Sequence, residues 1–127
     1  MVRKRLPRPT DRELAILQIL WERGPSTVRE VNEVMNQRER SVYTTTLKFM
    51  QIMTEKGLLE RDESQMRHVY KPAVTEETTQ RQLVGDLLER AFSGSAERLV
   101  LGALSAKKVS AEELARIRRK LDELKGK

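Results

Sequence analysis

Apolar side chains recur at intervals of three and four residues through most of this chain, which is the spacing of amphipathic helices. The first run covers residues 10–23 and opens on a Thr-x-x-Glu capping-box pattern. The second run begins at residue 26 or 27, opens on another such pattern, and ends near residue 36. Gly24 and Pro25 separate the two runs. The pattern therefore predicts two short helices joined by a tight turn.

A third helix is predicted over residues 41–56, with Ser41 as its N-cap and Gly57 as its stop. Its expected core positions are Val42, Phe49, Met50 and Met53. The opposite face has no carboxylate before residue 55 and carries hydroxyls, an amide and one cation, namely Tyr43, Thr44, Thr45, Lys48 and Gln51. Side chains of these types suit base edges and phosphates.

Two short β-like runs follow Gly57, at residues 58–61 and 68–71, and a polar loop joins them. A helix that continues through a glycine into a polar-tipped hairpin is typical of a winged helix-turn-helix. The predicted fold is thus mainly α with a small β-wing. Arg38 and Arg40 precede the third helix, and Arg67 and His68 lie in the wing, where all four could contact phosphates. A solvated basic loop is the alternative for residues 36–40.

The apolar pattern of residues 75–127 predicts three further short helices. Their apolar positions include a 3-4-3 seam in the last helix and comprise Leu83, Leu87, Leu88, Phe92, Leu99, Leu114, Ile117, Leu121 and Leu124. About 50 residues bury too little surface to be stable alone. We therefore expect these residues to form a helical dimerisation domain of a homodimer, with an intramolecular three-helix bundle as the alternative.

Charge and composition narrow the class of protein. The net charge is +6 and the pI is 9.9, which favours a polyanionic partner such as double-stranded DNA. The expected domains are a basic flexible arm at residues 1–9, a winged-helix DNA-binding domain at residues 10–74 and the dimerisation domain at residues 75–127. The arm could reach DNA or could be a solubilising tail. No run approaches the roughly 20 apolar residues of a membrane span, so we expect a cytoplasmic protein without a membrane partner.

Other functions fit the residues less well. The chain has one histidine, no cysteine and no glycine-rich phosphate loop, so we expect no enzyme activity, no catalytic residues, no metal site and no cofactor. A ligand-sensing winged-helix regulator stays open, because a groove lined by Leu83, Leu87, Phe92 and Leu99 could hold a small apolar molecule. A winged helix used for protein contacts also stays open.

Five segments of the chain stand out by their order and spacing, namely LAILQILWERGPSTVREV, VYTTTLKFMQIMTEKGLL, HVYKP, FSGSAERLVLGAL and VSAEELARIRRKLDEL. Together they resemble the penicillinase and methicillin-resistance repressor family (BlaI/MecI, related to the CopY repressors). The resemblance implies a winged helix with a C-terminal dimerisation domain, and a dimeric repressor that binds palindromic operators. Two recognition helices would then lie in successive major grooves about 34 Å apart. Carried over to this chain, the DNA-binding positions are Ser41, Tyr43, Thr44, Thr45, Lys48, Arg67 and His68.

The chain also departs from this family. Members that respond to β-lactams are similar in having an Asn-Phe bond, which is cut when a membrane sensor protease is activated. Gly102-Ala103 stands at that place here, and the cysteine pair of CopY-type relatives is absent. Cleavage by a sensor protease therefore stays open as the route to derepression.

Overall fold

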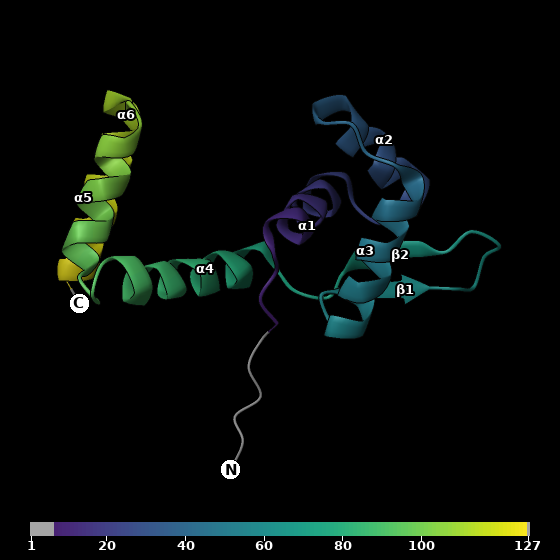
Figure 1. Cartoon of the computed structure of the whole chain (residues 1–127). Helices are drawn as coiled ribbons and strands as arrows, with labels where there is room; N and C mark the ends of the chain where they lie inside the picture. Colours follow the sequence, from purple (N-terminus) through teal and green to yellow (C-terminus); the bar gives the residue numbers. More distant parts are fainter. Residues whose placement is uncertain (1–6, 127) are drawn as a thin grey trace, which may run out of the picture. The chain divides into compact units, whose positions relative to one another are not determined.

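A computed structural model of the chain describes residues 7–126 (Figure 1). It divides the chain into two compact units, one ending at Leu83 and one beginning at Val84. The division falls inside helix α4 (Glu76–Ala91). Residues 1–6 of the expected basic arm lie outside the described residues, so the arm stays a prediction.

The first unit is a winged helix, as predicted, built from three helices and one antiparallel hairpin before the start of α4. Its elements are α1 (Asp11–Arg23), α2 (Val28–Arg38), α3 (Tyr43–Lys56), β1 (Leu59–Asp62) and β2 (Val69–Pro72). Both expected capping boxes are present, at the starts of α1 and α2. In the first, the Thr10 amide donates to Glu13 Oε1 at 2.9 Å. Each box satisfies amide groups that the first turn leaves unpaired.

Helix α2 is longer than predicted and takes in Arg38, which the sequence pattern assigned to a loop. The Glu39 amide still donates to the Met35 carbonyl at 3.0 Å. Residues 36–38 include no glycine or proline, so nothing in them forces the helix to end.

The start of α3 also differs from the prediction. Val42 is the N-cap and makes no side-chain capping bond, and its side chain is 55% exposed rather than in the core. The Ser41 hydroxyl lies 3.0 Å from the Thr46 hydroxyl, which donates to Asn32 Oδ1 at 2.7 Å. Ser41 is therefore part of a polar chain linking α2 to α3, and the helix begins one residue later than a Ser41 cap would give.

The wing strands lie one residue later than predicted. Gly57 has a φ of 87°, and the Leu58 amide donates to the Met53 carbonyl at 2.8 Å, so Leu58 still belongs to the C-terminal motif of α3. The strand register pairs Leu59 with Pro72. Tyr70 also exchanges two backbone hydrogen bonds with Ser26, of 2.8 and 3.0 Å, which tie the wing to the turn between α1 and α2.

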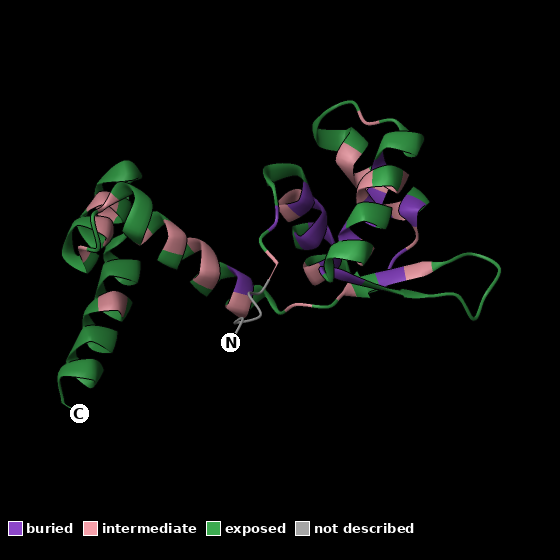
Figure 2. Ribbon diagram, turned by 60° about the horizontal axis from the view of Figure 1, so that its bottom comes forward, coloured by how far each residue is buried: buried purple, intermediate pink, exposed green. Residues whose placement is uncertain are grey.

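One apolar core holds the first unit together (Figure 2). Its buried members come from all three helices and the hairpin and are Ile16, Leu17, Ile19, Leu20, Val28, Val31, Met50, Met53, Leu58, Leu59 and Tyr70. Trp21 packs against this cluster and donates its indole N–H to the Val74 carbonyl at 3.1 Å. The partly buried tryptophan therefore holds the chain against the core as it leaves the wing.

The second unit holds the end of α4 together with α5 (Ala96–Ala106) and α6 (Ala111–Lys125). Ser93 and Gly94 form the turn before α5, with φ values of 48° and 77°. Ser95 and Ser110 cap α5 and α6 through their hydroxyls. None of the described residues 84–126 is buried, so this unit has no core of its own.

Candidate nucleic-acid interface

Helix α3 has one buried face and one exposed face. Thr46, Met50 and Met53 point into the core. The residues predicted for base contacts lie on the other side, where Thr44, Thr45 and Lys48 line one shallow hollow with Phe49 and Ile52. The structure thus brings these three predicted residues together on an accessible surface free of carboxylates.

The first turn of α3 is also accessible. Because Val42 makes no capping bond, the helix N-terminus keeps amide groups that a side chain could have satisfied. Such amides, together with the helix dipole, favour anions. Val42 and Tyr43 are 55% and 46% exposed, so apolar surface lies beside these amides.

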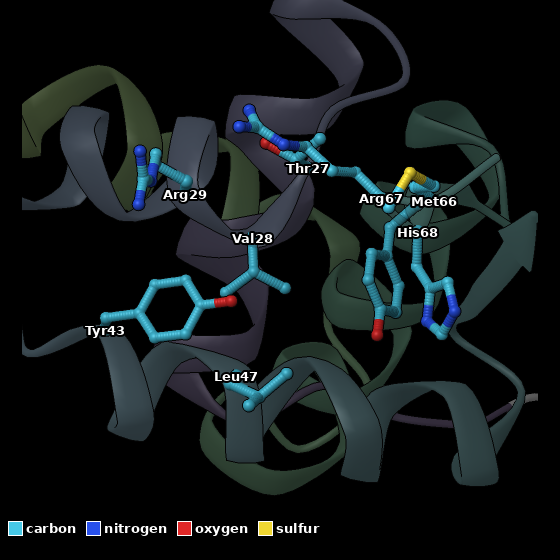
Figure 3. A pocket seen from close by; sticks show the side chains of 9 residues that line it. Thr27, Val28, Arg29, Tyr43, Leu47, Met66, Arg67 and His68 are labelled. Atoms are coloured by element: carbon cyan, nitrogen blue, oxygen red, sulfur yellow. The ribbon is translucent and has the colours of Figure 1, made fainter. Parts of the chain in front are cut away.

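A hollow of about 310 Å³ lies between α2, the start of α3 and the wing (Figure 3). Its lining residues are Thr27, Val28, Arg29, Tyr43, Leu47, Met66, Arg67, His68 and Tyr70. The predicted residues Tyr43, Arg67 and His68 therefore line the same hollow. Figure 3 shows the Tyr43 hydroxyl pointing into this hollow toward Val28.

Arg29 was missed by the sequence reasoning and lines the same hollow. Its neighbour Val28 is buried, whereas Arg29 itself is exposed in the first turn of α2. The sequence does contain a signal for Arg29. It lies beside a capping box and on the polar side of the helix that precedes the recognition helix.

Arg38 and Arg40 are placed differently from each other. Arg38 is exposed in the last turn of α2. Arg40 and Ser41 line a separate hollow near the start of α1, together with Asp11, Arg12 and Glu39. Acidic side chains share that hollow, so it is less suited to a phosphate than the hollow beside the wing.

The cations on the wing strands form ion pairs with carboxylates, whereas Arg67 in the wing loop forms none among the described residues. Arg61 lies 2.5 Å from Glu63, and Lys71 lies 3.5 Å from Glu60. Across residues 7–126, no ion pair involves Arg29, Lys48 or Arg67. These three cations are therefore available to an external anion.

A partly buried ion pair fixes the far end of α3. Lys56 Nζ lies 2.6 Å from Glu13 Oε1, and the Glu13 side chain is 3% exposed. Burial acts to raise the pKa of Glu13, but hydrogen bonds from Lys56 and Thr10, with the Lys56 charge, outweigh it and hold that pKa below its ordinary value. The pair therefore joins the start of α1 to the end of the helix that carries the candidate interface.

The residues predicted for dimerisation are partly or fully accessible in the single chain. Leu87, Leu114, Leu121 and Leu124 are 50%, 41%, 54% and 68% exposed. The others, which are partly buried, are Leu83, Leu88, Phe92, Leu99 and Ile117. Leu83 belongs to the first unit and the remaining eight to the second.

Residues 7–126 offer neither a cluster of metal ligands nor a membrane-spanning helix. Over residues 7–126, no three His, Cys, Asp or Glu side chains are grouped as metal ligands would be. In the same part of the chain, no helix has the length and apolar character needed to cross a membrane.

Three helices followed directly by a two-stranded wing define a winged helix-turn-helix. The family model of the penicillinase repressor matches residues 9–123. The transcriptional regulator BlaI of Mycobacterium tuberculosis is 31% identical over 121 residues, covering 94% of this chain and 87% of that protein. The penicillinase repressor of Bacillus licheniformis is 23% identical over 124 residues, covering 98% and 97%. The chain belongs to the penicillinase repressor family.

A solved structure supports the same fold. The DNA-binding domain of the repressor BlaI, determined in solution, superposes with a TM-score of 0.51 and 22% identity. The match covers 58% of this chain and 90% of that domain. The curated relatives are named as a transcriptional regulator and a repressor rather than as enzymes.

Proposed function

We propose that this chain is a transcriptional repressor that binds double-stranded operator DNA through α3. The observation that carries the proposal is the exposed face of α3, where Tyr43, Thr44, Thr45 and Lys48 stand without a carboxylate among them. Threonine methyl and hydroxyl groups suit thymine, and a lysine reaches guanine acceptors or phosphate. Membership of the penicillinase repressor family supports the same function.

The proposal includes a homodimer on an inverted repeat. The second unit has no buried residue among residues 84–126, so it needs a partner to cover its apolar side chains. A second copy of the chain could pack the apolar seam of its own α6 against the same seam of this one. A two-fold dimer would present two copies of α3 to half-sites one helical turn apart, about 34 Å. Occupancy of a promoter would then exclude polymerase without any catalysis.

The proposal is tested by removing the base-reading side chains. Duplexes recovered by selection from a randomised pool serve as the ligand. Lys48→Ala should weaken binding to the best duplex by about tenfold or more, and Thr45→Ala by a smaller factor. Both variants should keep the wild-type melting temperature, because both side chains are exposed.

Lys108→Ala is the control, since it removes the same charge from the exposed loop between α5 and α6. It should bind like the wild type. Unchanged affinity in both α3 variants would refute the assignment of α3 as the reading helix.

A further inference from the structure

The hollow between α2, α3 and the wing has the donor set of an anion site. Arg29 comes from α2, the Tyr43 hydroxyl from α3, and Arg67 and His68 from the wing (Figure 3). Among the described residues, no carboxylate lines the hollow. The nearby Glu30 is held elsewhere, because it accepts from Arg23 at 2.8 Å and from the Thr27 amide at 2.9 Å.

The hollow has room for a phosphate group and an apolar floor. Its volume of about 310 Å³ is far more than one water molecule needs, so a phosphodiester group fits. Buried Val28 and Tyr70 form part of the lining and hold the backbones that carry the donors. Arginine suits such a place because its planar fork gives a phosphate two parallel hydrogen bonds.

We infer that this hollow seats one phosphate of the DNA backbone, with Arg29 as the principal clamp and Tyr43, Arg67 and His68 as further donors. The inference rests on the proposed function. Tyr43 belongs both to this hollow and to the exposed face of α3, so the seated phosphate lies beside the bases that α3 reads. The seat therefore sets the depth and register of α3 in the groove and carries no sequence information itself.

Two consequences separate Arg29 from a base-reading residue such as Lys48. Arg29→Ala should lower affinity by about tenfold for every duplex alike, because the lost contact is to the backbone. It should also reduce the slope of log K against log salt concentration by about 1 per bound chain. Arg29→Lys, which keeps the charge without the fork, should recover part of the affinity.

The test pairs Arg29→Ala with neutralised phosphates. Each phosphate of a selected duplex is replaced in turn by an uncharged methylphosphonate, and the binding of the wild type and of Arg29→Ala is measured. One phosphate in each half-site should cost the wild type about tenfold when neutralised and cost Arg29→Ala nothing further. Lys108→Ala should show the same penalties as the wild type.

Equal penalties in the wild type and Arg29→Ala at every phosphate would overturn the inference. In that case the melting temperature is compared in sodium phosphate and in sodium chloride at matched ionic strength. A rise in phosphate that is lost in Arg29→Ala would assign the hollow to a free anion instead of the DNA backbone. Failure of the wild type to select any duplex would refute the proposed function itself, which is a different outcome.

Discussion

Glu13 links the start of α1 to the end of α3. Its carboxylate completes the capping box of α1 and accepts from Lys56 at the end of α3. The sequence pattern predicts the first role, because Thr10 and Glu13 are three residues apart. The second role joins positions 43 residues apart, which no local pattern encodes.

The lowered pKa of Glu13 predicts acid sensitivity. A carboxyl group whose pKa is lower in the folded state stabilises the fold above its ordinary pKa of 4.5, and that contribution is lost as pH falls through the folded value. Urea unfolding of the wild type should therefore show a declining free energy of unfolding below about pH 4.5.

Glu13→Gln should cost about 1.5–3 kcal/mol at neutral pH and flatten that acid dependence. Glu22→Gln, on the exposed side of α1, is the control and should change neither quantity. An acid profile of Glu13→Gln that parallels the wild type would show that Glu13 is not the group responsible.

Val42 leads to a prediction about base reading. Its side chain is 55% exposed beside the N-terminus of α3, where an apolar group can contact the 5-methyl group of thymine. One position in each half-site should therefore lose about fourfold in affinity when thymine is replaced by uracil, which is the worth of one buried methyl group.

Val42→Ala should bind the thymine and uracil duplexes equally, measured by fluorescence anisotropy. Thr44→Ser, which changes a neighbouring methyl group, serves as the comparison. A uracil penalty that persists in Val42→Ala would assign the methyl contact to another side chain.

At the scale of elements, the sequence predicts the helices of the first unit well and their ends less well. The capping boxes at Thr10 and Thr27 and the glycine stop at Gly57 are local signals, and the structure confirms them. The start of α3 differs because Ser41 bonds to Thr46 instead of capping the helix. That choice depends on Asn32, a residue of another helix, so the local pattern could not reveal it.

The candidate interface also has a part that the local sequence predicts and a part that only the tertiary fold brings together. Periodicity places the polar face of α3, because buried and exposed positions alternate along one helix. The hollow beside the wing gathers Arg29 and Arg67, which are far apart in the sequence. The bridge between Ser26 and Tyr70 links the same two segments, and pairing across such a distance comes from the tertiary fold.

Substitution of Gly57 tests whether its backbone conformation stabilises the turn between α3 and β1. Its φ of 87° is in the left-handed region, where a side chain costs roughly 1–2 kcal/mol. Gly57→Ala should lower the free energy of unfolding by about that amount in urea titrations. Gly57→Asn should lose less, because asparagine tolerates this conformation. Equal losses would indicate that backbone conformation is not the cause.

At the scale of the whole molecule, the exposed seam of α6 predicts the state of association. Leu121 is 54% exposed and Ile117 is half-buried in the single chain. Ile117→Asp combined with Leu121→Asp places two charges on this seam, so sedimentation equilibrium should report monomers. The variant should also bind a selected duplex far more weakly, since two half-sites are no longer engaged together.

Ala111→Asp combined with Ala115→Asp is the matched control. These positions are also exposed on α6 but lie off the seam, and the same two charges are added. This control should stay dimeric. A dimer that persists in the seam variant would place the interface elsewhere or make the seam intramolecular.

The proposed function requires two copies of this chain to read one inverted repeat. The most direct measurement is sequencing of the duplexes that the purified wild-type protein selects from a randomised pool at physiological salt. We expect one enriched inverted repeat whose half-site centres are about one helical turn apart. Enrichment of no sequence, with binding that salt abolishes equally for all duplexes, would contradict it.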